Sequence, residues 1–263
     1  MLYKLGAVPY LNALPLIHYL KERPKLAAPA ALTRLLQLGE VDIATAPVVA
    51  LFENPDYTLI PGICIGSNGR VESVKLFFRD PKITVENVQS IYLDMESKTS
   101  ALLLKVLLKY KFGRNLDEIM FYHPIPHQDE EARLLIGDKA MKNPPNPPLS
   151  KGGEGGFLDL GHEWTSWTGL PFVYAAWVGR SPEVSKRAIH ELTEARDKGC
   201  ANIASVVPAN GPFPFATIKN YLENNIIYRL GEKELRGMEL FRDYLIRDGL
   251  LHIPAKHLLY AVS

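Results

Sequence analysis

Short apolar runs alternate with helical patterns through the first half of this 263-residue chain, and this alternation constrains the fold more than any other feature. The spacing of the apolar residues predicts strands at Leu5–Val8 and Val41–Ala46, with helices at Ala13–Lys21 and Ala31–Gly39. A strand, a helix and a second strand form the repeating unit of α/β proteins. The chain is therefore expected to have an α/β fold.

The remaining predicted elements continue to the end of the chain without an internal repeat. Further strands are predicted at Thr58–Cys64, Val74–Phe78, Ile91–Leu93, Ile119–His123 and Phe172–Val178, and further helices at Ser97–Tyr110, Glu130–Ile136, from Ser181-Pro182-Glu183 to a stop at Gly199, and Glu232–Arg247. A second lobe is expected from Pro81 onward. Residues Asn143–Gly156 are rich in Pro and Gly, which predicts an exposed, mobile loop.

Charge and cysteine content exclude several classes of protein. The 30 Lys and Arg residues nearly balance the 29 Asp and Glu residues, so no broad positive surface is expected for nucleic acid or an anionic membrane. Cys64 and Cys200 lack metal-ligand spacing, although a disulfide between them stays open. No signal peptide or membrane-spanning run is recognised. We expect a cytoplasmic protein that acts on a small molecule; composition does not determine its oligomeric state.

The opening segment, Lys4–Leu16, contains the first candidate functional residue. Its sequence KLGAVPYLNALPL is an apolar strand that breaks at Pro9 and continues as an amphipathic segment around Asn12. An Asn amide beside the free N–H groups of a helix start suits a small anionic ligand. The alternative, which the sequence by itself favours, is that Asn12 only caps the first helix.

Two other polar groups are candidates for ligand binding. Ser97, Thr99 and Ser100 fall in the first turn of a predicted helix, where they either bind a carboxylate or serve as helix caps. The turn Gly66-Ser67-Asn68-Gly69 either approaches a ligand closely with its backbone or forms an ordinary hairpin turn. Arg70 and Ser73 follow that turn and face either a cleft or solvent.

The acidic, histidine and tryptophan residues are more ambiguous. Asp138 and Asp159 are candidates for a general acid, but carboxylates at such positions more often cap a helix or pair with a base. The His162-Glu163 pair and the two residues His123 and His127 lack the further ligands of a metal site, so no metal and no cofactor is expected. Trp164, Trp167 and Thr168 are expected to pack behind a cleft, and contact between an aromatic ring and a ligand stays open.

Five blocks of the sequence carry a family resemblance. They are VPYLNALPL at 8–16, PGICIGSNGRVESVKLF at 61–77, SKTSALLLKVLL at 97–108, LLIGDKA at 134–140 and DLGHEWTSWTGLPFVYAAWV at 159–178. In this order they resemble the chorismate dehydratases, the first enzymes of the futalosine route to menaquinone. The resemblance implies a two-lobed fold like the type II periplasmic binding proteins, with a ligand cleft between the lobes. It implies chain crossings near Phe77–Asp80 and Tyr174–Arg180, a first lobe of 1–80 plus 174–263, and a second lobe of 81–173 that contains the 143–156 loop.

The resemblance also implies an activity. Chorismate dehydratase is a carbon–oxygen lyase that removes water from chorismate to give 3-[(1-carboxyvinyl)oxy]benzoate. Asn12 matches the Asn of the family's YLN motif and is expected to be catalytic, and chorismate is expected to contact Ser67, Asn68, Gly69, Ser97, Thr99, Ser100, Gly137 and Asp138. Because the motif holds no His or Glu side chain, we expect the enolpyruvyl carboxylate of the substrate to accept the ring proton, positioned by Asn12.

The chain departs from the family pattern at Pro9 and Glu96, where small hydroxyl-bearing or small polar residues are common. Two other functions remain open. The related 1,4-dihydroxy-6-naphthoate synthase shares the fold but has an N-terminal motif of the CPND type in place of PYLN. The second alternative is a cytoplasmic small-anion binding protein without catalytic activity, because fold by itself does not define function.

Overall fold

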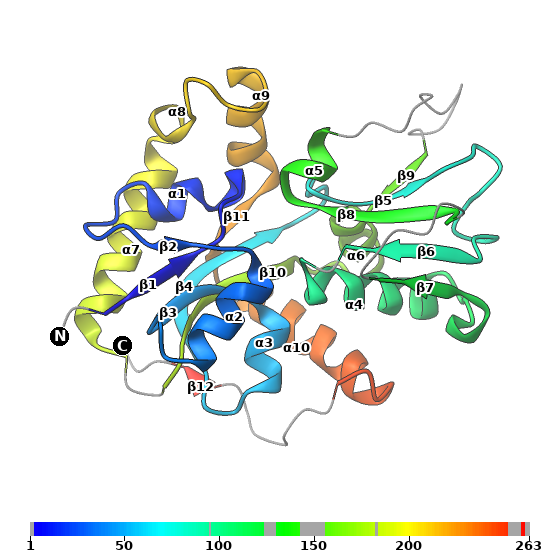
Figure 1. The fold of residues 1–263 in the computed structure, drawn as a ribbon, viewed down its shortest axis with the longest axis horizontal. Coiled ribbons are helices and arrows are strands. Elements are labelled where there is room, and N and C mark those ends of the chain that lie inside the picture. The colour runs from blue at the N-terminus through cyan, green and yellow to red at the C-terminus, as the bar shows by residue number, and fades with distance from the viewer. Residues whose placement is uncertain are drawn as a thin grey trace.

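The computed structural model describes residues 3–94, 96–123, 130–142, 156–181, 184–251 and 259–260 as two β-sheets with helices around them (Figure 1). The first sheet has the order β11-β4-β10-β3-β1-β2, with β12 also paired to β4, and the second has the order β7-β6-β8-β5-β9. Both sheets mix parallel and antiparallel pairs. This arrangement confirms the expected two-lobed α/β fold.

The strands of the first sheet are β1 (Leu5–Ala7), β2 (Lys25–Leu26), β3 (Ile43–Pro47), β4 (Thr58–Ser67), β10 (Phe172–Gly179), β11 (Ile227–Leu230) and β12 (Leu259–Tyr260). Those of the second sheet are β5 (Val74–Phe78), β6 (Ser90–Leu93), β7 (Met120–Tyr122), β8 (Ala132–Ile136) and β9 (Phe157–Asp159). The helices are η1 (Leu11–Ala13), α1 (Leu14–Ile17), α2 (Pro29–Gln37), α3 (Val48–Glu53), α4 (Lys98–Val106), η2 (Leu107–Lys111), η3 (Leu116–Glu118), α5 (Gly137–Lys142), α6 (Leu160–Thr168), α7 (Lys186–Ala201), α8 (Ile203–Val206), α9 (Phe215–Asn220), η4 (Tyr221–Asn225) and α10 (Glu232–Arg247).

The chain passes between the sheets earlier than expected in both directions. Strand β5 pairs with β8 and β9 of the second sheet, so the first crossing is residues 68–73 and the expected crossing at Phe77–Asp80 is wrong. Strand β10 already belongs to the first sheet from Phe172, so the return falls at residues 169–171. Because β4 and β5 are both buried apolar runs, their sequences do not reveal that their partners lie in different sheets.

Three predicted helices need correction. Residues 132–136 form strand β8 because their burial alternates with a period of two, and a short apolar run of this kind fits either period. The first helix ends at Ile17, well before Lys21. Helix α7 is capped by Ser185, which accepts from the Ala188 N–H, and it continues through Gly199. A Cβ at Gly199 would lie 1.8 Å from the Pro15 carbonyl oxygen, so glycine permits close packing there and does not end the helix.

Other predictions match the structure or fall outside it. Helix α10 has the bounds predicted for Glu232–Arg247. The predicted loop at Asn143–Gly156 lies outside the described residues except for Gly156, and so do Pro182 and Glu183. In the described part of the chain, no helix has the length and apolar character needed to cross a membrane.

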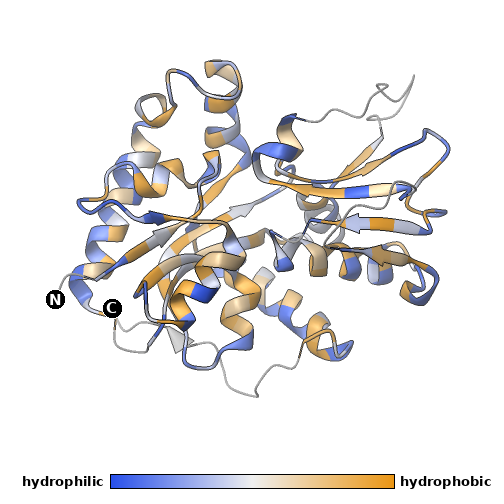
Figure 2. Ribbon diagram, viewed as in Figure 1, coloured by the Kyte–Doolittle hydropathy of each residue, from blue (hydrophilic) through white to orange (hydrophobic). Residues whose placement is uncertain are grey.

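Apolar residues fill the interior of both lobes and the region where they join (Figure 2). Trp164 of α6 is fully buried, and its ring meets Phe172 of β10 at 5.2 Å and Phe241 of α10 at 6.0 Å between centroids. These edge-to-face contacts hold the second lobe against the first. Trp164 therefore packs in the core behind the cleft, as predicted.

Candidate functional site

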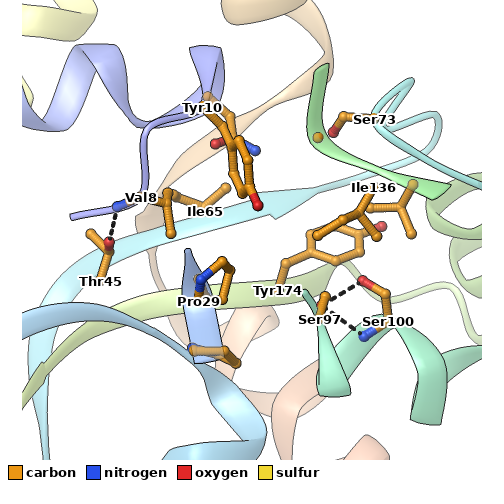
Figure 3. A pocket seen from close by; sticks show the side chains of 15 residues that line it. Val8, Tyr10, Pro29, Thr45, Ile65, Ser73, Ser97, Ser100, Ile136 and Tyr174 are labelled. Atoms are coloured by element: carbon orange, nitrogen blue, oxygen red, sulfur yellow. Dashed lines mark hydrogen bonds between the residues drawn. The ribbon is translucent and has the colours of Figure 1, made fainter. Parts of the chain in front are cut away.

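A cleft lies between the two sheets (Figure 3). The first sheet and its helices supply one wall, and the beginning of the second lobe supplies the other. The first wall consists of Val8, Tyr10, Asn12, Pro29, Thr45, Pro47, Ile65, Tyr174 and Ala175, and the second wall of Ser73, Val74, Ser97, Ser100, Ile136 and Gly137. Their polar side chains are hydroxyls and one amide, so the cleft presents neutral hydrogen-bonding groups on an apolar surface.

Asn12 lies in η1, directly after β1, and it caps neither η1 nor α1. The helix-cap interpretation is therefore wrong. Its Oδ1 is buried and has no partner among the described residues. An unpartnered buried oxygen costs free energy unless something donates to it. Because Asn12 lines the cleft, its amide is a candidate contact for a ligand there.

Ser97 and Ser100 both line the second wall, and the helix-cap interpretation of Ser97 is confirmed. Ser97 is the N-cap of α4: its Oγ accepts from the Ser100 N–H at 3.1 Å and lies 2.9 Å from the Ser100 Oγ (Figure 3). Thr99, in contrast, is fully buried, and its Oγ1 accepts from the Val49 N–H at 3.5 Å. Thr99 therefore does not line the cleft in this structure.

The Ser67-Asn68-Gly69 segment lies behind the cleft. It is the start of a crossing between two sheets, so the hairpin interpretation is wrong. Ser67 Oγ lies 3.4 Å from the hydroxyl of Tyr174, which does line the cleft, whereas Asn68 is exposed. The Gly69 N–H donates to Thr165 Oγ1, and its φ of +108° suits glycine. The crossing contributes Ser73 to the cleft instead.

Gly137 and Asp138 follow strand β8 at the second wall. Gly137 lines the cleft with a φ of +60°, and a Cβ there would lie 3.2 Å from the ring of Tyr10. Asp138 accepts from the Leu11 N–H at 3.3 Å. Burial raises the pKa of Asp138, and the bond from Leu11 only partly opposes that shift. Asp138 thus supports the backbone beside Asn12 without lining the cleft.

The Asp159 carboxylate accepts hydrogen bonds from three backbone N–H groups. Its carboxylate caps α6 through the His162 N–H and accepts from the N–H groups of Val71 and Glu72 at 3.0 and 2.8 Å. Burial raises the pKa of Asp159, although these three bonds oppose the shift. The contacts fix the first crossing, where Glu72 has a φ of +62°. They support the capping interpretation of Asp159.

Tyr10 and Glu96 join the two walls, which the sequence did not reveal. The Tyr10 hydroxyl donates to Glu96 Oε2 at 2.6 Å, and Lys139 donates to Glu96 Oε1 at 2.7 Å. Burial by itself would raise the pKa of Glu96, but the bonds from Lys139 and Tyr10 outweigh it and lower that pKa. Burial and Glu96 together raise the pKa of Tyr10. Tyr10 sits within the PYLN motif, which was the available signal.

Neither cysteine is oxidised, and the described residues contain no group of three or more His, Cys, Asp or Glu side chains placed to hold a metal ion. Cys64 is buried and Cys200 is exposed, so the disulfide left open by the sequence is absent. Glu163 is paired with Lys111 at 2.5 Å. His127 lies outside the described residues.

Two sheets joined by two crossings, with a cleft between them, define a protein with the periplasmic-binding-protein-like fold. The protein AF1704 from Archaeoglobus fulgidus superimposes with a TM-score of 0.70 at 13% identity over 95% of this chain and 98% of its own. The periplasmic aliphatic sulphonate binding protein SsuA from Escherichia coli superimposes with a TM-score of 0.58 at 14% identity, over 95% and 93%. Identities this low establish the fold only.

Sequence comparison identifies the family. A family model described as menaquinone biosynthesis matches residues 3–247. Chorismate dehydratase of Thermus thermophilus is 31% identical over 92% of this chain and 95% of its own length. The chain therefore belongs to this menaquinone-biosynthesis family.

Proposed function

We propose that this protein is a chorismate dehydratase, a carbon–oxygen lyase of menaquinone biosynthesis. The observation that carries the proposal is the unpartnered Oδ1 of Asn12 in a neutral cleft, opposite the Ser97 and Ser100 hydroxyls. The similarity to a chorismate dehydratase over nearly the whole of both chains supports it. Two unpaired thiols are typical of a reducing compartment, so we place the activity in the cytoplasm.

The reaction removes one proton and one hydroxide from adjacent ring carbons. The proton leaves the carbon that bears the enolpyruvyl ether, the hydroxyl leaves the neighbouring carbon, and the electron pair of the broken C–H bond completes the aromatic ring. Water and 3-[(1-carboxyvinyl)oxy]benzoate are the products. Aromatisation drives the reaction, so the protein mainly has to orient the substrate and exclude solvent.

The second wall is suited to bind a carboxylate of the substrate. Ser97 and Ser100 present hydroxyls at the start of α4, where the helix dipole and the free N–H groups of the first turn favour negative charge. Such a site holds an anion without a buried cation. We assign one carboxylate of chorismate to it, while Gly137 allows the ring of Tyr10 to close over the ligand.

The cleft hydroxyls are poor proton acceptors. The two tyrosines that line it, Tyr10 and Tyr174, have pKa values raised by burial, so both carry their proton at neutral pH. We propose that the enolpyruvyl carboxylate accepts the ring proton through a six-membered arrangement within the substrate. Asn12 positions that carboxylate and the departing hydroxyl, because its amide both donates and accepts.

The decisive experiment is incubation of the purified protein with chorismate, followed by absorbance and mass spectrometry. We expect a product lighter by one water with an aromatic absorbance spectrum. A chorismate analogue without the enolpyruvyl carboxylate should bind but not react, and its normal turnover would exclude the substrate-assisted step. Chorismate binding without loss of water would instead favour the small-anion binding protein. Absence of both binding and turnover would redirect attention to 1,4-dihydroxy-6-naphthoate synthase activity.

A further inference from the structure

Tyr221 is a buried side chain of the first lobe that contacts the second wall of the cleft without lining it. It is the first residue of η4, which leads into β11 of the first sheet, and only 2% of it is exposed. Its hydroxyl donates to Ser73 Oγ at 2.8 Å. Ser73 is itself buried and lines the second wall. A hydroxyl of the first lobe is therefore hydrogen-bonded to a cleft residue of the second wall.

Ser73 is held to the second lobe by its backbone. Its carbonyl oxygen accepts from the Gly137 N–H at 2.8 Å, and β5 begins at the next residue. A second bond from the same helix reaches this crossing, since Asn225 Nδ2 donates to the Arg70 carbonyl at 3.0 Å. Helix η4 therefore makes two hydrogen bonds to the first crossing, and the bond from the Tyr221 hydroxyl is the nearer of the two to the cleft.

Tyr221 is the donor in its bond to Ser73. Burial raises the pKa of Tyr221, and the bond with Ser73 opposes this shift without cancelling it. Tyr221 therefore keeps its proton at neutral pH and can donate it in a hydrogen bond to Ser73.

We propose that Tyr221 is a positioning residue for the dehydration, because its hydroxyl donates to Ser73 and thereby fixes how the Ser73 hydroxyl faces the substrate. The Tyr221 bond to Ser73 uses one lone pair of that serine, so the Ser73 proton is free to point into the cleft. Tyr221 thus makes Ser73 a hydrogen-bond donor on the second wall.

This inference rests on the proposed function, and its test separates the two. Tyr221→Phe removes only the hydroxyl and keeps the buried ring. We expect kcat for chorismate to fall about tenfold, with KM changed less than about twofold, because the substrate still binds but the Ser73 hydroxyl is free to rotate. Tyr228→Phe is the matched control: Tyr228 is also buried, lies on β11, and its hydroxyl has no partner among the described residues. That control should keep wild-type kinetics.

A double-mutant cycle distinguishes positioning from general loss of structure. Tyr221→Phe and Ser73→Ala remove the two ends of one bond, so the double variant should be far less impaired than the product of the single losses. Multiplicative losses, or wild-type kcat in Tyr221→Phe, would overturn the inference while wild-type turnover still upholds the proposed function.

A readout that needs no turnover comes from crystal structures of the wild type and Tyr221→Phe. We expect Ser73 to occupy one rotamer in the wild type and a different or divided one in the variant. An unchanged Ser73 side chain would contradict the positioning role of Tyr221 even if chorismate proves not to be the substrate.

Discussion

The first wall of the cleft differs from the second in how its polar groups are held. On the first wall, Asn12 leaves Oδ1 without a partner. On the second wall, Ser97 and Ser100 bond to each other and to the backbone of α4. A group left unsatisfied gains most when a ligand arrives, whereas a satisfied group presents a preformed surface. We therefore expect changes to the first wall to reduce kcat and changes to the second wall to raise KM.

The largest effect is expected from Asn12→Ala. Removing the amide should lower kcat about 100-fold or more with a smaller change in KM, because it deletes a positioned group that acts on the reacting atoms. Steady-state kinetics with chorismate measure this. The control Asn87→Ala, in an exposed loop of the second lobe, should behave as the wild type. A raised KM with unchanged kcat for Asn12→Ala would contradict the expectation that changes to the first wall act mainly on kcat.

Ser97→Ala tests the second wall, with KM expected to rise about tenfold while kcat changes little. The variant also loses an N-cap, which costs about 1 kcal/mol of unfolding free energy. Ser185→Ala is a matched control, because Ser185 caps α7 in the same way and lies outside the cleft. It should show the same loss in chemical denaturation and wild-type KM. An equal rise of KM in both variants would assign the effect to stability.

Glu96→Gln tests the contact between the walls, and a rise in KM of about threefold is expected because Lys139 loses its nearer carboxylate partner and keeps only Asp94 at 3.6 Å. Since the pKa of Glu96 is lowered in the folded protein, its contribution is complete above its ordinary value near 4.5 and is lost as pH falls through the folded pKa. KM should therefore differ between variant and wild type equally at pH 6 and pH 8. Glu40→Gln, in an exposed pair with Lys25, is the control that should leave KM unchanged.

The smallest effect is expected for Asp138→Asn. Because burial raises the pKa of Asp138, its ionised form is less favourable in the folded protein, and stability falls as pH rises through that pKa. The variant keeps an acceptor for the Leu11 N–H and should be more stable than the wild type by less than about 1 kcal/mol at pH 7, with no gain at pH 3. Denaturation curves at both values measure it, with the exposed Asp56→Asn as control. A large loss of kcat would instead identify Asp138 as the general acid.

The sequence predicted part of the site because a motif and its neighbours are local. Asn12, Ser97, Ser100 and Gly137 were all predicted and all line the cleft. Thr99 was predicted with them, but adjacent residues of a helix point in different directions, and Thr99 faces α3. Ser67 and Asp138 lie one layer behind the lining, and Asn68 is exposed.

Residues that depend on pairing across the chain were missed. Tyr10 acquires its role from Glu96, which lies 86 positions away in the sequence. Ser73 and Tyr221 acquire theirs from each other, across 148 positions. The sheet assignment of β5 failed for the same reason, since its partners β8 and β9 come from much later in the chain. Apolar periodicity reports burial but does not identify the neighbour.

The sequence by itself determined the α/β class, the family resemblance and the position of Asn12 in the helical segment after the first strand, because strand and helix periods and short motifs are encoded in consecutive residues. Only the tertiary structure decided where the chain crosses between the sheets, that Asn12 keeps a free acceptor, and that Tyr221 of the first lobe bonds to Ser73 of the second wall. Those features arise from hydrogen bonds between segments far apart in sequence, whose geometry exists only once both lobes have folded against each other.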